Sequence, residues 1–136
     1  MADTDHNVVL LRHTLPDGSN HIDCFIDDLP ESESGLLSIK MPTDPRDLCD
    51  DQTITGRLIG RHRRHYLNYE GPVGPGANGE ARGHVKQVAQ GLLLSKEVGH
   101  QQMLFKLQWL APLGFVQVLC LTEHSDGMVK IVLSAP

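Results

Sequence analysis

The chain is poor in aromatic residues and has no long apolar run. Three Phe, two Tyr and one Trp among 136 residues leave a core that must consist mostly of Val, Leu and Ile, and this composition favours strands. No segment approaches the roughly 20 consecutive apolar residues that cross a bilayer. The first seven residues are polar and acidic rather than basic and then apolar. We therefore expect a protein that is neither secreted nor embedded in a membrane.

Cysteines are also few, and none of them forms a pairing motif. Cys24, Cys49 and Cys120 lie far apart and include no CxxC spacing. This argues against a disulfide framework and against a zinc knuckle. Reduced thiols are typical of the cytoplasm, which is the expected location.

The chain lacks an excess of basic residues. Its formal net charge is −5, which taken alone argues against a protein that coats nucleic acid through bulk positive charge. The charge is nevertheless uneven, because arginines gather around His62 and His65: Arg57, Arg61, Arg63 and Arg64. A locally basic segment on an acidic protein is a candidate anion site.

The chain also lacks helical periodicity in its apolar residues. Short apolar runs separated by turn residues recur instead, at residues 8–11, 22–26, 36–41, 85–94, 103–110, 115–121 and 128–133. They predict a mainly β fold: one domain over residues 1–136, forming a closed or nearly closed antiparallel β-barrel. One or two short helices are expected, near residues 44–50 or 56–66. Residues 1–6 are expected to be flexible, and the Gly- and Pro-rich residues 71–83 to form a loop.

Two neighbouring strands bring possible metal ligands together. Residues 21–26 alternate, so that His21 and Asp23 share one strand face about 7 Å apart. Turn residues between His13 and His21 predict an antiparallel hairpin, which would place His13 beside them. Strict alternation puts His13 on the apolar face of its own strand, so a bulge or the strand end is expected to re-aim it. An exposed sheet face remains the alternative for His21 and Asp23.

His62 lies far along the chain, within Gly-Arg-His-Arg-Arg-His-Tyr. Spacing alone does not show that it meets the hairpin. The residues by themselves leave open that His62 and His65 are solvated members of a basic loop.

The order of these segments matches a known pattern. His13 is followed by His-Ile-Asp-Cys-Phe at 21–25, Ser-Ile-Lys-Met-Pro at 38–42, Arg-His-Arg-Arg-His-Tyr at 61–66 and Tyr-Glu-Gly at 69–71. This order resembles the 3′-phosphoesterase domain of bacterial DNA ligase D, and more closely the small stand-alone DNA polymerase ligase N-terminal domain proteins. The resemblance covers most of residues 7–95.

The resemblance implies a metal-dependent site. By position, His13, Asp23 and His62 would bind Mn²⁺, and two imidazoles with a carboxylate also suit Zn²⁺ or another divalent ion. His21 and Tyr66 would belong to the active site, with His21 supplying a proton or a hydrogen bond.

Arginines near these positions would contact phosphate or the nucleic-acid backbone: Arg12, Arg61, Arg63 and Arg64. Glu70 would orient a ligand, or else stabilise a turn. The implied activity is removal of a phosphate or ribonucleotide from 3′ ends of DNA in end repair. Its partners would be DNA or RNA–DNA 3′ ends, with any polymerase or ligase on a separate chain.

The chain departs from the family pattern at four places. Phe25 stands where the family has an active-site Arg, Arg61 replaces an Asp, Ile39 replaces a Trp, and Val-Ala at 88–89 replaces Trp-Asp. Loss of the guanidinium removes a bidentate phosphate contact. Two alternatives therefore stay open: a catalytically impaired relative that binds metal and nucleic-acid ends without turnover, or a barrel that binds another phosphorylated ligand.

Overall fold

The computed structural model describes residues 6–30, 34–48, 52–74, 82–111 and 114–134. Nine strands form one antiparallel sheet that closes in a ring, and the described residues contain no helix of seven or more residues. The predicted fold class is confirmed. None of the described helices is long and apolar enough to cross a membrane. Residues 1–5 and 75–81, part of the segments expected to be flexible or looped, lie outside the described residues.

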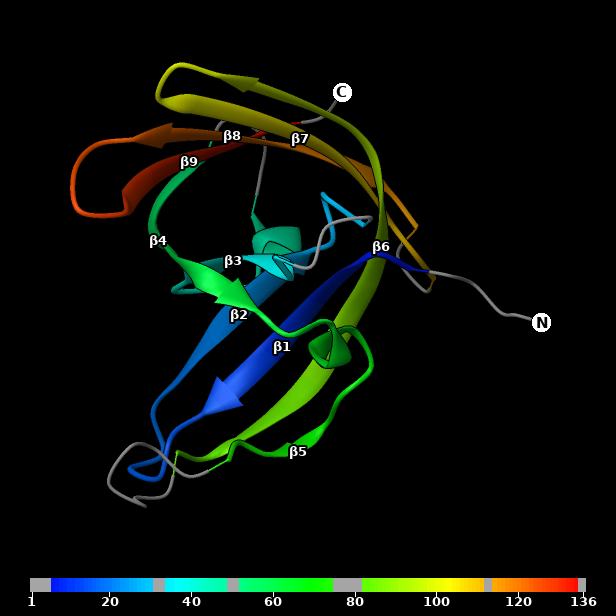
Figure 1. Cartoon of the computed structure of the whole chain (residues 1–136), viewed down its shortest axis with the longest axis vertical. Helices are drawn as coiled ribbons and strands as arrows, with labels where there is room; N and C mark the ends of the chain where they lie inside the picture. Colours follow the sequence, from blue (N-terminus) through cyan, green and yellow to red (C-terminus); the bar gives the residue numbers. More distant parts are fainter. Residues whose placement is uncertain (1–5, 31–33, 49–51, 75–81, 112–113, 135–136) are drawn as a thin grey trace.

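The strands run in the order β1-β2-β3-β4-β9-β8-β7-β6-β5, and an additional β1–β6 pairing closes the ring (Figure 1). In chain order the elements are β1 (Val8–Thr14), β2 (Asn20–Ile26), β3 (Leu36–Met41), η1 (Pro45–Asp47), β4 (Thr53–His62), η2 (Arg64–Leu67), β5 (Gly71–Pro72), β6 (His84–Gly99), β7 (Gln102–Trp109), β8 (Val116–Glu123) and β9 (Met128–Ser134). The two η elements are single 3₁₀ turns.

The long strand β6 joins the two ends of the sheet. Its first half pairs with β1 and its second half with β7, and it curves along one side of the molecule (Figure 1). Gly91 pairs with Val8 on one side and with Trp109 on the other. A Cβ atom on Gly91 would lie 2.9 Å from the Trp109 ring, so the closure requires glycine here.

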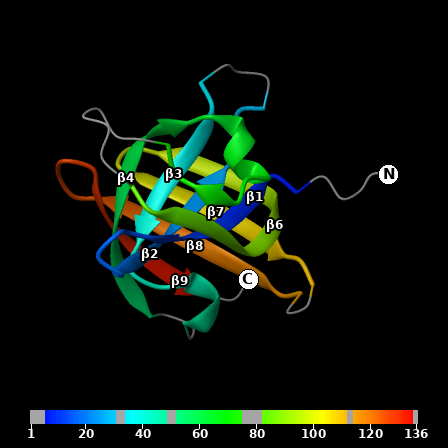
Figure 2. The same cartoon turned by 90° about the horizontal axis from the view of Figure 1, so that it is seen from below.

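The apolar residues form two cores, one on each face of β1. The inner core fills the ring and includes Leu10, Cys24 and Trp109. The outer core lies on the opposite face of β1 and β2, where Val9, Leu11 and four other residues pack together. The segment around η2, residues 63–70, covers this face, and we call it the covering segment (Figure 2). The uninterrupted apolar run at residues 8–11 thus reflects a strand that is buried on both sides.

The structure differs from the sequence expectation at residues 53–62. These residues form β4 between β3 and β9 rather than a helical turn, and only residues 64–67 make a helix in this region. Glycines and arginines interrupt the apolar pattern of β4, which hid a strand that begins with the β-branched Thr-Ile-Thr. This strand matters because it carries His62.

Candidate metal centre

The site is built on the β1–β2 hairpin that the sequence predicts. His13 pairs directly with His21, and Leu11 pairs with Asp23. At the turn, the Asp17 carboxylate accepts hydrogen bonds from the backbone amide and the hydroxyl of Ser19, at 2.9 and 2.6 Å. These bonds lower the pKa of Asp17 below its ordinary value. The turn thereby fixes the register that brings the two histidines together.

His13, His21 and Asp23 share one face of the hairpin without any bulge between β1 and β2. Residues directly opposite each other in an antiparallel pair point the same way. The expectation that His13 must be re-aimed was therefore wrong. His13 does share the face of Val9 and Leu11, but this face is the outer one, covered by the segment around η2, so the histidine reaches the site without re-aiming.

These three residues form what we call the His–Asp cluster. One ligand atom from each of them lies within 4.8 Å of the other two. His21 Nε2 is 3.0 Å from Asp23 Oδ1, and His13 Nδ1 is 3.6 Å from Asp23 Oδ2. The two imidazole rings lie edge to face, with centroids 5.0 Å apart. Asp23 itself is only 6% exposed.

The hydrogen bonding of His13 determines which of its nitrogens faces the carboxylate with a lone pair. Nε2 lies 2.7 Å from the backbone carbonyl oxygen of Arg82. Because a carbonyl only accepts hydrogen bonds, Nε2 carries the hydrogen, and Nδ1 of the neutral ring is left with a lone pair. That lone pair is directed at the Asp23 carboxylate. Either a proton on Nδ1 or a metal ion between the two atoms would satisfy this contact.

The other carboxylate oxygen of Asp23, Oδ1, would also be stabilised by a cation. Oδ1 is buried and accepts no hydrogen bond within the described residues, although His21 Nε2 lies 3.0 Å from it. A buried carboxylate oxygen without a donor is costly. A metal ion held by both imidazoles and this carboxylate would satisfy all three groups. The residues present therefore fit a divalent metal ion.

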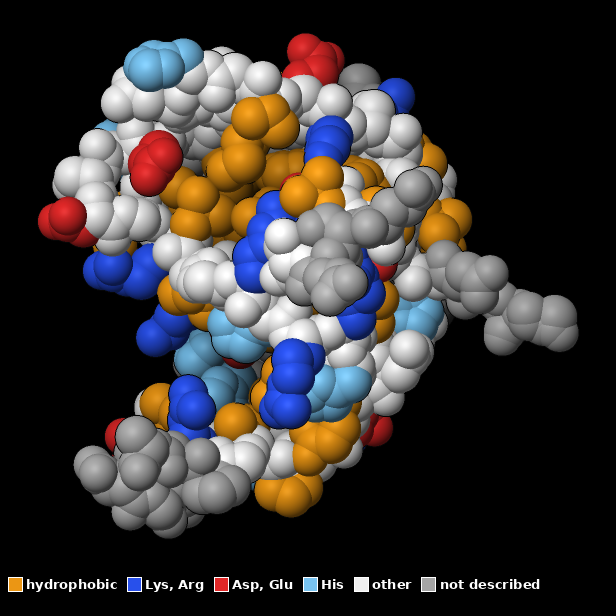
Figure 3. Space-filling view, in the orientation of Figure 1, with side chains coloured by type: hydrophobic (Ala, Val, Ile, Leu, Met, Phe, Trp, Pro, Cys, Tyr) orange, Lys and Arg blue, Asp and Glu red, His pale blue; other side chains and the backbone are white. Residues whose placement is uncertain are grey.

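The His–Asp cluster opens into a cavity of about 620 Å³. Its lining includes His62 from the end of β4 and Tyr66 from η2. In the space-filling view, histidine side chains gather in a recess with Lys and Arg side chains around it (Figure 3). The structure thus brings His62 and Tyr66, separated from the hairpin in sequence, to the same cavity.

His62 lines this cavity but is not part of the His–Asp cluster. Its Nδ1 lies 2.8 Å from the Gly60 carbonyl oxygen and 2.7 Å from the hydroxyl of the buried Ser38. The carbonyl again identifies Nδ1 as the protonated nitrogen, which leaves Nε2 of the neutral ring as an acceptor. His21 occupies the third place in the cluster that the family resemblance assigned to His62.

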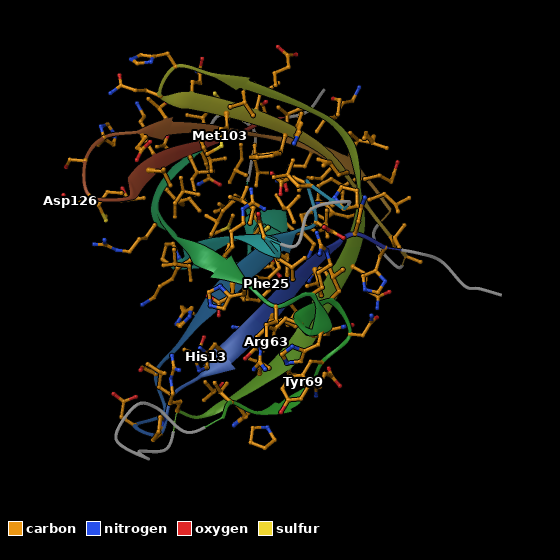
Figure 4. The ribbon with its side chains drawn as sticks, in the orientation of Figure 1. His13, Phe25, Arg63, Tyr69, Met103 and Asp126 are labelled. Carbon is orange, nitrogen blue, oxygen red and sulfur yellow. The ribbon has the colours of Figure 1, made fainter. Side chains whose placement is uncertain are left out.

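Phe25, at the position of the family's arginine, is part of the cavity wall. Its ring stacks on Tyr66 with centroids 5.5 Å apart and an interplanar angle of 15°. The ring of His62 lies 5.3 Å away. Figure 4 shows Phe25 and His13 on the same wall of the sheet, with Arg63 and Tyr69 from the covering segment beside it.

Three of the four predicted phosphate-binding arginines are engaged elsewhere. Arg12 pairs with Ile22, not with the histidines, so it lies on the opposite face of the hairpin, where it donates to Asn20. Arg61 makes two hydrogen bonds to Asp28, at 2.7 and 3.1 Å. Arg64 donates to the carboxylate of Asp27, at 3.0 Å. Arg63 is exposed on the covering segment.

The pKa of Asp28 is lowered by its pairing with Arg61. Burial acts to raise this pKa, but the hydrogen bonds and charge of Arg61, with the charge of Lys96, outweigh burial and lower it. Correspondingly, the hydrogen bond to Asp28 raises the pKa of Arg61. This pair fastens the end of β4 to the chain after β2, which holds His62 in place.

Two cationic residues that the sequence did not single out line the cavity, namely Lys40 and Arg82. Lys40 pairs with Asp23 across β2 and β3 and so shares its face. Within the described part of the chain, neither side chain makes an ion pair. The alternation of β3, which aligns Lys40 with Ser38, is the signal that would have identified Lys40.

Glu70 lies away from the His–Asp cluster. Its carboxylate accepts a hydrogen bond of 2.7 Å from the backbone amide of Gln87 on β6, and it does not line the cavity. This contact ties the residue before β5 to β6.

Fold and site together define a small, closed-sheet β protein with two imidazoles and one carboxylate at the floor of a cationic cavity. No family model matches the chain, and no curated protein does.

Proposed function

We propose that this protein binds a divalent metal ion at the His–Asp cluster and hydrolyses phosphoesters at 3′ ends of DNA. Mn²⁺ is the first candidate, and Zn²⁺ or another divalent ion is compatible with the same ligands. The order of motifs shared with the ligase D phosphoesterase domain supports the choice of substrate.

One observation carries the proposal: the arrangement of acceptors around Asp23. In the neutral tautomer of His13, Nδ1 presents its lone pair to Oδ2 at 3.6 Å, and Oδ1 is buried without a hydrogen-bond donor among the described residues. Hydrogen bonding of His13 Nε2 to a backbone carbonyl is the outer support that metal-binding histidines generally have. The cluster therefore has the charge, the geometry and the support of a metal site.

The cavity also contains groups suited to a phosphate. A bound divalent ion would supply Lewis acidity toward a phosphoryl oxygen. Lys40 and Arg82 are the cavity's cations, and they would neutralise further phosphate charge. His62 Nε2 is the acceptor available to take a proton from an attacking water, while the hydrogen bonds of Nδ1 hold the ring in place.

A second candidate is binding of metal and phosphorylated ends without turnover. Phe25 replaces the arginine of the related domains with a ring that holds no charge, and Arg61 and Arg64 are paired with Asp28 and Asp27. Less positive charge is then available to stabilise a transition state than in the related domains.

Two measurements on the same samples distinguish these functions. Calorimetric titration with Mn²⁺ and then with a DNA primer that carries a 3′-phosphate measures binding of metal and of DNA ends, and release of phosphate from this primer measures turnover. We expect both in the wild-type protein, and loss of both in His13→Ala. His124→Ala is the matched control, because this histidine is exposed, lies in the turn between β8 and β9, and does not line the cavity.

Mn²⁺ binding with phosphate release supports the phosphoesterase. Mn²⁺ binding and primer binding without release support the second candidate. Absence of Mn²⁺, Zn²⁺ and other divalent-ion binding by the wild-type protein refutes both.

A further inference from the structure

A row of cations extends from the His–Asp cluster across the outer face of the sheet. Lys40 on β3 pairs with Asp23, and Arg57 on β4 pairs with Lys40. Lys130 on β9 pairs with Thr55, which lies two residues before Arg57 on β4. Residues directly opposite each other, and residues two apart in one β-strand, point to the same side of a sheet. The three cations therefore share the face of the metal ligands, and we call them the basic track.

Acidic side chains do not neutralise the basic track. Lys40, Arg57 and Lys130 are exposed, and none of them forms an ion pair among the residues that the structure describes. The β-strands that carry them contain no Asp or Glu, although the whole chain has 17 acidic and only 12 basic side chains. Lys and Arg side chains lie beside the histidines of the recess, on the side of the β8–β9 turn (Figure 3, in the orientation of Figure 1). Such a surface attracts a polyanion.

The extent of the basic track indicates a ligand longer than one phosphoester. Neighbouring β-strands lie about 4.8 Å apart, so the Cα atoms of Lys40 and Arg57 are about 5 Å and about 10 Å from that of Asp23. Lys130 lies one β-strand further. Lys40 lines the cavity, whereas Arg57 and Lys130 do not. The two outer cations are therefore suited to a ligand that extends beyond the cavity and repeats its negative charge, as a nucleic-acid backbone does.

We propose that the basic track binds the backbone of the DNA strand whose 3′ end lies at the His–Asp cluster. This inference rests on the proposed function, because it takes the terminal phosphate to be bound at the metal ion. The DNA strand would leave the cavity beside Lys40 and cross β4 and β9, with phosphates near Arg57 and Lys130. Contacts of this kind go to phosphate, so binding would not depend on base sequence.

The test compares two ligands that are not hydrolysed. Thymidine 3′-methylenephosphonate occupies the cavity alone, whereas an oligothymidylate of about eight nucleotides that ends in the same group also reaches the basic track. Their affinities for the Mn²⁺-loaded protein are measured by calorimetry over a range of salt concentrations. We expect the oligothymidylate to bind the wild type at least about tenfold more tightly at low salt, and this advantage to fall as salt rises.

The double variant Arg57→Gln/Lys130→Gln removes the outer part of the basic track and leaves the cavity lining intact. Oligothymidylate affinity at low salt should fall about tenfold, and the slope of log affinity against log salt should decrease by about 1.4, since each phosphate contact of a single strand contributes about 0.7. Lys130→Gln alone should decrease this slope by about 0.7. Affinity for the short ligand should stay unchanged, which also shows that the variants are folded.

Arg12→Gln/Lys86→Gln is the matched control. It also removes one exposed Arg and one exposed Lys, which pair with each other across β1 and β6. Arg12 and Lys86 lie on the opposite face of the hairpin from the His–Asp cluster, so both affinities and the salt slope should keep their wild-type values.

Equal wild-type affinity for the two ligands overturns this inference. So does an oligothymidylate affinity that Arg57→Gln/Lys130→Gln leaves unchanged or that the control variant lowers equally. In these cases, Mn²⁺-dependent binding of the short ligand leaves the proposed function standing. If neither ligand binds in a Mn²⁺-dependent manner, the proposed function fails and this inference fails with it.

Discussion

Replacing Asp23 by asparagine should have opposite effects on the metal-free and the metal-loaded protein. The substitution keeps the shape of the side chain and removes its charge. In the metal-free wild type, the carboxylate is 6% exposed and its Oδ1 has no hydrogen-bond donor in the described structure. An amide in the same place would donate its N–H to the lone pair of His13 Nδ1, which now faces a carboxylate oxygen at 3.6 Å.

The magnitudes follow from these contacts. One buried group gains a partner, so the free energy of unfolding of the metal-free protein should rise by about 1 kcal/mol in Asp23→Asn. With metal at 100 times its Kd, the wild type should gain about 2.7 kcal/mol. For a chain of 136 residues, this gain corresponds to an increase in Tm of about 10 °C. Asp23→Asn should lose nearly all of that increase.

The assay is thermal and urea unfolding at pH 8, where an ordinary imidazole is neutral, with EDTA or with excess Mn²⁺. Asp126→Asn is the control, since it also removes one negative charge but lies in the β8–β9 turn, away from His13 (Figure 4). It should keep the wild-type response to Mn²⁺. The reasoning is refuted if Asp23→Asn lowers the stability of the metal-free protein by 1 kcal/mol or more, because the carboxylate would then already have a cationic partner.

Three further predictions concern the scaffold. Gly35→Ala should lower the free energy of unfolding by about 2 kcal/mol or more in urea titrations, because Gly35 has a φ of +89° and a Cβ would lie 2.3 Å from a β4 carbonyl oxygen. Gly60→Ala is the control: this glycine has open space around it, so the substitution should change the free energy of unfolding by less than about 0.5 kcal/mol. Equal effects of the two substitutions would contradict this prediction. Burial, aided by nearby carboxylates, raises the pKa of the Cys24 thiol to about 12, so peptide mapping should find it alkylated by iodoacetamide at pH 8 only after unfolding. The pKa of Asp28 lies below its ordinary value of 3.8, so the stability from its pair with Arg61 is present above that pH and is lost as pH falls through the lowered value. Arg61→Gln should therefore cost about 1 kcal/mol at pH 7 and progressively less in acid, and a loss that does not depend on pH would disagree.

The β1–β2 hairpin shows which features of the site the local sequence predicts. Alternation over residues 21–26 and the turn residues before them predicted that His13, His21 and Asp23 lie together, and the His13–His21 pairing confirms this. Such features are local, because side-chain direction in a strand and the register of a hairpin depend on a few consecutive residues. The same alternation correctly placed His13 on the face of Val9 and Leu11, but it does not reveal that this face is the outer one, covered by a distant segment, so the expected re-aiming of His13 was wrong.

The arginines show that local sequence patterns do not predict long-range partners. A basic run at residues 61–64 predicted phosphate contacts, yet Arg61 and Arg64 pair with the carboxylates of Asp28 and Asp27, more than 30 residues away. Long-range ion pairs of this kind depend on how the strands are arranged, and composition does not encode their partners. Lys40 likewise lines the cavity because of the arrangement of the strands, since β3 pairs with β2.

By itself, the sequence determined the mainly β fold, the β1–β2 hairpin and the proximity of two imidazoles to one carboxylate, because each of these follows from the period of a strand or from a tight turn. Tertiary structure alone decided that β4 carries His62 to the same cavity, that Phe25 and Tyr66 stack there, and that Lys40 and Arg82 are its cations. These contacts join residues far apart along the chain. They are fixed only when the sheet closes and the segment around η2 covers the outer face of β1.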